Sequence, residues 1–262
     1  FPLTFDYLQV DCKEGVTAGA GHTIYTARLF PGEWHNQRAL ICAPTGKLVT
    51  APRIERRGAG FKTTHFEQNL YASADAWSAP VAAEVGPDGA VYIADWYNSI
   101  VQHNIYGDKQ KKGKGNAYIS EHRDRKHGRI YRIAPKNTQP SLMPELGTME
   151  QRIKALSHPN LFWRLTAQRL INEKDGKKAV PALKKILGKD STTSLHAVSM
   201  LAQLLSPEDF QAATVYQLDF KTPRATRIII QNLPATNDNV LGLLKTIHTL
   251  TPDAQHATLL KI

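Results

Sequence analysis

Cysteine is scarce in this chain of 262 residues, which has only Cys12 and Cys42. Two cysteines permit one disulfide at most, and the apolar or strand-like neighbours of each favour ordinary buried thiols over a bridge or a catalytic nucleophile. No Cys-x-x-Cys-His sequence occurs, so no c-type haem is attached within this segment. Cysteine content therefore leaves both the disulfide and the compartment open.

Long hydrophobic runs are also missing. No stretch reaches the ~18 apolar residues that a transmembrane helix needs, so we expect no transmembrane segment within this sequence. The chain begins at Phe1 without an initiator methionine, and its last residues, 259–262, continue an apolar helical pattern without a glycine cap or a proline stop. We interpret it as an internal piece of a longer protein.

Charge of one sign is not concentrated. The net charge of +10 is spread evenly along the chain, whereas nucleic-acid binding favours a concentrated basic stripe, so we expect no nucleic-acid partner. The stretch from Lys109 to Arg129 is locally basic. It is either a solvated loop or a rim that attracts an anionic ligand.

The composition changes along the chain and indicates two domains. Residues 1–135 are rich in glycine, threonine, valine and short turns, and residues 147–262 are rich in leucine, alanine and lysine at helical spacing. Residues 136–146, with Pro140 and Pro144, continue a proline-rich stretch that begins at Pro135 and predict an extended linker. The chain is therefore predicted to be β in its first part and α in its second.

Short strand-like segments recur at close intervals in the first part. They predict an antiparallel all-β architecture, with strands near residues 23–29, 38–42, 47–51, 61–66, 81–85, 90–94 and 129–133. A β-propeller blade takes ~40–45 residues and a propeller needs about four to eight blades. Residues 1–135 therefore predict about three blades, a partial β-propeller.

The most informative phrase is Gly86-Pro-Asp-Gly-Ala-Val-Tyr-Ile-Ala-Asp-Trp-Tyr-Asn98. Its Pro-Asp-Gly turn leads into an alternating strand, in which Val91 and Ile93 are expected on one face and Tyr92 and Ala94 on the other. Polar and aromatic residues follow where the strand leaves the sheet, which is where propellers carry functional side chains.

Several of these side chains have suitable chemistry. Asp95 and Asn98 present the hard oxygens that bind Ca²⁺ or a sugar, or they fix their own loop. Trp96 and Tyr97 either stack on a sugar or quinone or pack between blades. Arg129 is a candidate partner for an anion or a cofactor carboxylate.

Three histidines, His22, His103 and His127, also have both functional and structural interpretations. His22 follows Ala18-Gly-Ala-Gly and is either a general base for a sugar hydroxyl or a turn residue satisfied by its own loop. His103 is a candidate for cofactor binding. His103 and His127 together match no specific metal-ligand spacing, which favours structural roles for the pair.

From residue 147 the apolar period is helical, with breaks near residues 172–176, 188–190, 206–207 and 236–238. Comparable helices start near Pro159, Asp190, Thr222 and Pro252, a repeat of about 31 residues that is typical of a HEAT-like α-solenoid. The concave face of a solenoid is a binding surface, so we expect a protein partner there.

A family resemblance adds to this interpretation. Segments Ala18–Thr26, Arg38–Val49, Ala79–Asn98, Ile100–Asn104 and His127–Ile133, in this order, resemble the large secreted "membrane-bound dehydrogenase" proteins of Bacteroidetes, planctomycetes and verrucomicrobia. The resemblance implies a sugar-dehydrogenase-like propeller joined to HEAT-type repeats, often with a c-type cytochrome domain elsewhere. It also implies an extracytoplasmic location and pyrroloquinoline quinone with Ca²⁺ as cofactors.

The expected function is therefore part of a quinone-dependent oxidoreductase that acts on a sugar or related alcohol and passes electrons to a cytochrome domain outside this segment. His22 is the catalytic candidate, Asp95, Trp96, Asn98, His103 and Arg129 are cofactor-binding candidates, and Asp95 and Asn98 are also metal-ligand candidates. The alternative is a non-catalytic scaffold in a cell-surface assembly, in which the propeller binds a glycan or a protein.

Overall fold

The computed structural model describes residues 19–57, 60–66, 68–75, 77–98, 124–188, 191–214, 223–234, 236 and 239. These residues fall into two compact units. The β unit contains residues 19–55 and 62–141, and the helical unit contains residues 142 onward together with residues 56–61. Within the described part of the chain, no helix has the length and apolar character required to cross a bilayer.

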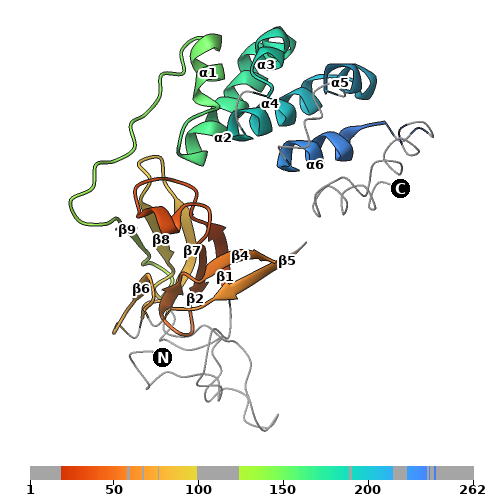
Figure 1. Cartoon of the computed structure of the whole chain (residues 1–262). Coiled ribbons are helices and arrows are strands. Elements are labelled where there is room, and N and C mark those ends of the chain that lie inside the picture. The colour runs from red at the N-terminus through yellow and green to blue at the C-terminus, as the bar shows by residue number, and fades with distance from the viewer. Residues whose placement is uncertain are drawn as a thin grey trace. The chain divides into compact units, whose positions relative to one another are not determined.

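The β unit is built from small antiparallel sheets (Figure 1). The first sheet has the order β1-β2-β3-β6, with β1 (Ala20–Ile24), β2 (Ala39–Ala43), β3 (Leu48–Thr50) and β6 (Tyr71–Ala72). Another has the order β7-β8-β9, with β7 (Pro80–Val85), β8 (Val91–Asp95) and β9 (Arg129–Ile133). A two-stranded sheet pairs β4 (Arg53–Arg57) with β5 (Gly60–Thr64), and a 3₁₀ turn, η1, spans Gly32–Trp34.

The predicted turn and strand around residues 86–95 are confirmed. Gly86 donates its N–H to the carbonyl of Ala90 (2.9 Å), and Gly89 adopts a φ of +87°, which a residue with a side chain rarely tolerates. In β8, Val91 and Ile93 are fully buried, while Tyr92 and Ala94 on the other face are half-buried. The alternating pattern therefore places β8 with one face in the core.

Tyr25 joins the two larger sheets of the β unit. Its hydroxyl donates to the carbonyl of Gly89 (3.0 Å) and accepts from the N–H groups of Leu29 and Phe30 (2.9 Å each). The ring is fully buried and packs against Phe30 and Trp34. These hydrogen bonds offset the cost of removing the Tyr25 hydroxyl from water.

Two expectations for the first part needed correction. The strand expected near residues 23–29 begins and ends earlier, at Ala20–Ile24, because Tyr25 and the residues after it turn into the core. The other is β4 (Arg53–Arg57), which is not among the expected strands. Most residues of β4 are charged, so its sequence has no alternation of apolar and polar residues from which a strand could be predicted.

The second part is helical in every described element, as predicted (Figure 1). The elements are α1 (Met149–Ala155), α2 (Leu161–Leu170), a π-helical turn η2 (Ile171–Asp175), a 3₁₀ turn η3 (Gly176–Ala179), α3 (Val180–Lys185), α4 (Ser191–Leu204), α5 (Pro207–Thr214) and α6 (Pro223–Asn232). The order β then α is therefore confirmed, while the propeller and the solenoid remain predictions. The helix expected to start near Pro252 lies outside the described residues.

Local signals explain where these helices begin. The side chain of Thr148 accepts from the N–H of Gln151, and the Gln151 side chain accepts from the N–H of Thr148, which forms a capping box ahead of α1. Asn160 caps α2 through the N–H of Phe162 (3.0 Å). The helices bury a common apolar core that includes Leu156, Leu183, Leu201 and Phe210, so packing stabilises helices too short to persist alone.

Candidate functional site

Asp95 and Arg129 form the central ion pair of the β unit. The two residues are paired across the ends of β8 and β9, and Arg129 donates from Nε (3.1 Å) and Nη2 (2.7 Å) to Oδ2 of Asp95. The Asp95 side chain has no exposed surface, whereas the Arg129 side chain is 29% exposed. Strand register therefore brings together two of the residues selected from the sequence.

The Asp95 carboxylate also accepts hydrogen bonds from neighbouring donors. Oδ2 accepts from Ser78 Oγ (3.1 Å), and Oδ1 accepts from the N–H groups of Ala79 (2.7 Å) and Tyr97 (2.9 Å). A calcium ligand needs an oxygen that faces the ion rather than N–H and O–H donors. Asp95 therefore does not fit the metal-ligand role expected of it and instead ties the end of β8 to residues 78–79.

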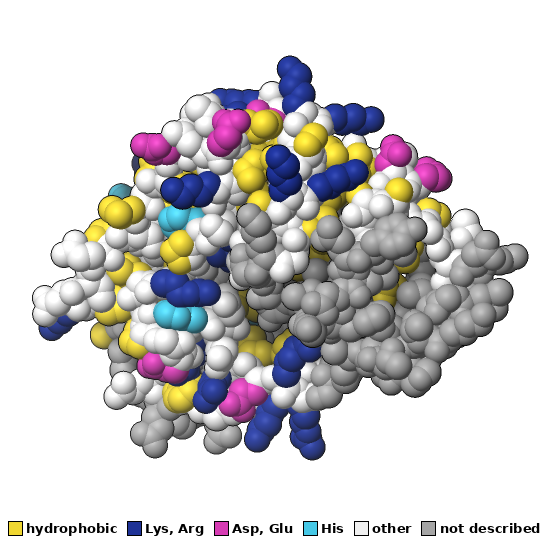
Figure 2. All heavy atoms as spheres, turned by 45° about the horizontal axis from the view of Figure 1, so that its top comes forward, with side chains coloured by type: hydrophobic (Ala, Val, Ile, Leu, Met, Phe, Trp, Pro, Cys, Tyr) yellow, Lys and Arg dark blue, Asp and Glu magenta, His cyan; other side chains and the backbone are white. Residues whose placement is uncertain are grey.

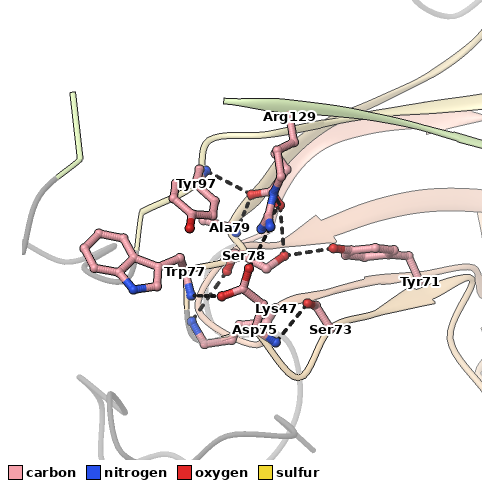
Figure 3. Close-up of polar contacts among 10 residues, drawn as sticks. Lys47, Tyr71, Ser73, Asp75, Trp77, Ser78, Ala79, Tyr97 and Arg129 are labelled. Atoms are coloured by element: carbon pink, nitrogen blue, oxygen red, sulfur yellow. Dashed lines mark hydrogen bonds and ion pairs between the residues drawn. The ribbon is translucent and has the colours of Figure 1, made fainter. Parts of the chain in front are cut away.

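Arg129 also binds a second carboxylate. Its Nη1 donates to Oδ2 of Asp75 across 2.6 Å, and Oδ1 of Asp75 accepts from the N–H of Trp77 (Figure 3). Burial alone would raise the pKa of Asp75, but the hydrogen bonds from Trp77 and Arg129 outweigh it and lower that pKa. The same two carboxylates raise the pKa of Arg129 against the effect of its burial. The guanidinium is thus held charged and fixed between two acids.

A buried polar cluster continues from this pair. The Lys47 ammonium, almost fully buried, lies 3.5 Å from the carbonyl oxygen of Ser78, and burial lowers the pKa of Lys47 although Asp75 and Asp95 partly offset it. The hydroxyls of Tyr71 and Ser78 are 2.9 Å apart (Figure 3). Burial and a hydrogen bond with Tyr71 raise the pKa of Tyr131 to about 12. These hydrogen bonds connect Lys47, Tyr71 and Ser78 to the Asp95 carboxylate within the β unit.

An open cleft lies beside the ion pair. Its volume is about 550 Å³, and it is lined by Trp77, Tyr97, Asp124, His127, Gly128 and Arg129. We call it the aromatic cleft. The rings of Trp77 and Tyr97 stack with centroids 5.7 Å apart and planes 21° apart, and His127 meets the Tyr97 ring edge-on at 6.0 Å.

Tyr97 owes its position in the aromatic cleft to the ion pair. It adopts a φ of +55°, an uncommon conformation for a residue with a side chain. The N–H bond to Asp95 holds its backbone, and the Arg129 guanidinium lies 4.3 Å from the centre of its ring. A cation over an aromatic face is attractive. The buried pair therefore positions an aromatic wall of the aromatic cleft.

A histidine and an aspartate form a second polar pair at this cleft. His127 Nδ1 and Asp124 Oδ2 are 2.5 Å apart, and Asp124 Oδ1 also accepts the N–H groups of Lys126 and His127. The N–H of Lys126 and the His127 contacts lower the pKa of Asp124 to about 2. Asp124 is therefore ionised at neutral pH and fixes the orientation of the His127 imidazole.

The other predicted site residues are placed differently. His22 lies in β1 with an exposed side chain and is not among the donors to Asp95. Trp96 is 40% exposed and Asn98 is buried, and neither belongs to the residues that line the aromatic cleft. His103 lies outside the described residues. The hypothesis that these residues and Asp95 share one mouth of a propeller remains a prediction.

Sequence reasoning missed Asp75 and Trp77 and assigned His127 a structural role. Two sequence features could have identified these residues: the spacing of Asp124 and His127, and an Asp-Ala-Trp phrase between turns. Both features are common in ordinary loops and therefore do not indicate a site by themselves. Within the described ranges, no group of three or more histidine, cysteine, aspartate or glutamate side chains is arranged to hold a metal ion.

Comparison with known proteins gives one result for the first part of the chain. Residues 1–137 match a family described as Domain of unknown function (DUF7133). No curated protein matches the chain. No solved structure matches it either.

Proposed function

The chain belongs to the DUF7133 family over residues 1–137, more than half of its length, and we propose that its β unit binds a carbohydrate in the aromatic cleft. In this proposal the chain is part of a β-propeller followed by a HEAT-like solenoid, in an extracytoplasmic protein. The proposal takes up the alternative drawn from the sequence, a glycan-binding scaffold, and gives it a site.

The observation that carries the proposal is the stacked pair Trp77 and Tyr97 at the wall of an open cleft. Sugar rings present C–H faces that pack on aromatic rings, while their hydroxyls need fixed polar partners at the ring edge. His127 and the charged Asp124 supply such partners beside the two rings. The volume of about 550 Å³ is sufficient for a small oligosaccharide.

A pair of matched tryptophan variants tests the proposal. Binding of the full chain to a panel of soluble neutral oligosaccharides is measured by isothermal titration calorimetry. Trp77→Ala is expected to weaken the affinity for any sugar that binds by at least about tenfold, since aromatic anchors dominate binding energy. Trp96→Ala removes an exposed tryptophan that does not line the aromatic cleft and is expected to change the affinity by less than about twofold.

Two results would contradict carbohydrate binding at this cleft. One is an equal loss of affinity in Trp77→Ala and Trp96→Ala while both variants retain the wild-type circular dichroism spectrum. The other is the absence of binding across the whole panel at millimolar sugar.

The second candidate is the sugar or alcohol oxidoreductase expected from the sequence. The observation that favours it is the His127–Asp124 pair, because an imidazole oriented by a carboxylate is a common general base. Pyrroloquinoline quinone would supply the electron acceptor in such a reaction. Its carboxylates need cations, but Arg129, the arginine among the described lining residues, already binds Asp75 and Asp95, so this lining does not fit that cofactor.

Activity measurements separate the two candidates. Sugar-dependent reduction of an artificial electron acceptor is assayed with quinone and Ca²⁺ supplied to the complete protein. If the reaction occurs, the general base is identified by His22→Gln and His127→Gln, since losing a general base costs about two to four powers of ten in rate. Binding without turnover would favour the scaffold.

A further inference from the structure

The helical unit contains a groove that the proposed function does not use. It lies between α1 and the region formed by α3 and the start of α4, and its volume is about 480 Å³. We call it the α1–α3 groove. Its lining consists of Met149, Glu150, Ile153, Lys154, Ser157, Ala182, Lys185, Ile186 and Thr193.

The floor of the α1–α3 groove is apolar. Ile153 is buried, and Met149, Ala182 and Ile186 are half-buried, with part of their surface left to solvent. These side chains also pack on the core of the unit, so the floor is held in place by the fold. A concave apolar surface of this kind is suited to the apolar side chains of a bound segment.

The rim of the α1–α3 groove carries a net positive charge, from two lysines and one glutamate, Glu150. Lys154 and Lys185 are exposed on opposite sides of the floor. The exposed Lys177, Lys178 and Lys184 continue this charge along η3 and α3. Figure 2, which turns the top of Figure 1 toward the viewer, shows Lys and Arg side chains beside hydrophobic ones in the upper part of the view, with Asp and Glu side chains among them.

Asp175, the acidic residue nearest in sequence to Lys177, does not neutralise the lysines of η3 and α3. Both carboxylate oxygens of Asp175 accept from Arg152, from Nε at 2.8 Å and from Nη2 at 2.7 Å, and the two side chains are 10% and 6% exposed. The carboxylate is thus already committed to an internal ion pair. The lysines from 177 to 185 therefore present a positive surface.

We propose that the α1–α3 groove binds a short acidic, amphipathic segment of a partner protein. Apolar side chains of the segment occupy the floor over Ile153 and Ile186, and its carboxylates face Lys154 and Lys185. Charge complementarity argues for this occupant. A second copy of this chain is a poorer match, because each chain carries a net charge of +10.

A designed peptide tests the proposal on the full chain. The probe is a short fluorescein-labelled peptide that alternates leucine with glutamate, and binding is followed by fluorescence anisotropy. One control peptide replaces every leucine by serine and keeps the charge. Another replaces every glutamate by lysine. We expect the leucine–glutamate peptide to bind at least about tenfold more tightly than either control. Only this peptide has both leucines that can pack on the apolar floor and glutamates that can pair with the lysines of the rim.

Matched lysine variants locate the site. The double variant Lys154→Glu/Lys185→Glu is expected to weaken binding of the leucine–glutamate peptide by about tenfold or more, as attraction becomes repulsion at the rim. The control is Lys136→Glu/Lys174→Glu, which reverses two exposed lysines that neither line the groove nor belong to the lysines from 177 to 185, and we expect less than about threefold. Thermal unfolding of each variant verifies that the helical unit is folded.

Three results would overturn the proposal. They are no binding of the leucine–glutamate peptide at millimolar concentration, equal binding of the serine–glutamate peptide, and equal losses in the two lysine double variants. The last two would assign binding to general attraction of the chain for polyanions, including nucleic acids and anionic membranes.

Discussion

Arg164 donates its Nε–H to Nε2 of His196 across 2.9 Å, and both side chains are buried in the helical unit. The accepting nitrogen must be unprotonated, so the contact exists only while His196 is neutral. Burial, and secondarily the charge of Arg164, lower the pKa of His196 from 6.5 to about 4. The helical unit therefore contains a histidine whose protonation opposes folding.

The first prediction is loss of helical stability in mild acid. Between pH 6.5 and pH 4 the unfolded chain binds a proton at His196 that the folded chain does not. Stability from this group is therefore complete above about pH 6.5 and declines as the pH falls toward 4, by about 3 kcal/mol in total. Urea unfolding followed by circular dichroism at a series of pH values measures this decline.

Variants isolate the His196 contribution from the general effect of carboxylate protonation. His196→Gln keeps an acceptor for Arg164 and removes the titration, so its stability is expected to fall less over this range. His65→Gln, at an exposed position of the β unit, is expected to behave as wild type. Parallel pH profiles for wild type and His196→Gln would disprove the prediction.

The second prediction compares two arginines of β9 that each pair with an aspartate. Arg129→Gln leaves the fully buried Asp95 carboxylate without its cation and is expected to cost about 3 kcal/mol. Arg132→Gln breaks a pair with Asp88 whose arginine side chain is 45% exposed, and is expected to cost much less, because exposed ion pairs contribute little to stability. Urea unfolding of the β unit, monitored by tryptophan fluorescence, measures both. Similar costs would contradict the structural role of the Asp95–Arg129 pair.

The third prediction concerns the packing of β1 on β7. Gly21 has a φ of +53°, and a Cβ atom there would lie 2.4 Å from the carbonyl oxygen of Val81 and from Cα of Ala82. Backbone atoms cannot move aside locally, so Gly21→Ala is expected to cost about 3 kcal/mol or to prevent folding. At Gly32 a Cβ meets nothing within 4 Å, and Gly32→Ala is expected to change stability by about 0.5 kcal/mol or less. Melting temperatures of the two variants test this order.

The fourth prediction concerns Cys42. The thiol is fully buried, and burial together with the charge of Glu84 raises its pKa to about 11. Since the thiolate is the reactive form, iodoacetamide at pH 8 is expected to leave Cys42 unmodified in the folded protein and to alkylate it in denaturant. Mass spectrometry of a Cys12→Ser variant gives the result for this thiol alone. Rapid alkylation without denaturant would contradict it.

Local patterns in the sequence were sufficient for much of the fold. The Pro-Asp-Gly turn before β8 and the alternation of Val91 and Ile93 depend on neighbouring residues only, and both were confirmed. The helical period of the second part was confirmed in the described helices α1 to α6 for the same reason. Strand β4 was missed because its charged residues carry no apolar alternation.

The sequence by itself determined most of the segments that form strands or helices, β4 excepted, and that Asp95 and Arg129 have site-like chemistry. Only the tertiary structure decided what they do. The Asp95 carboxylate has the chemistry to bind either a metal ion or an arginine. Which of the two it binds depends on the donors around it, which come from residues 78, 79 and 129 and are brought together by the strand register. The aromatic cleft likewise combines Trp77, Tyr97 and His127. Contacts between residues so distant in the chain depend on strand pairing and packing, which local periodicity does not encode.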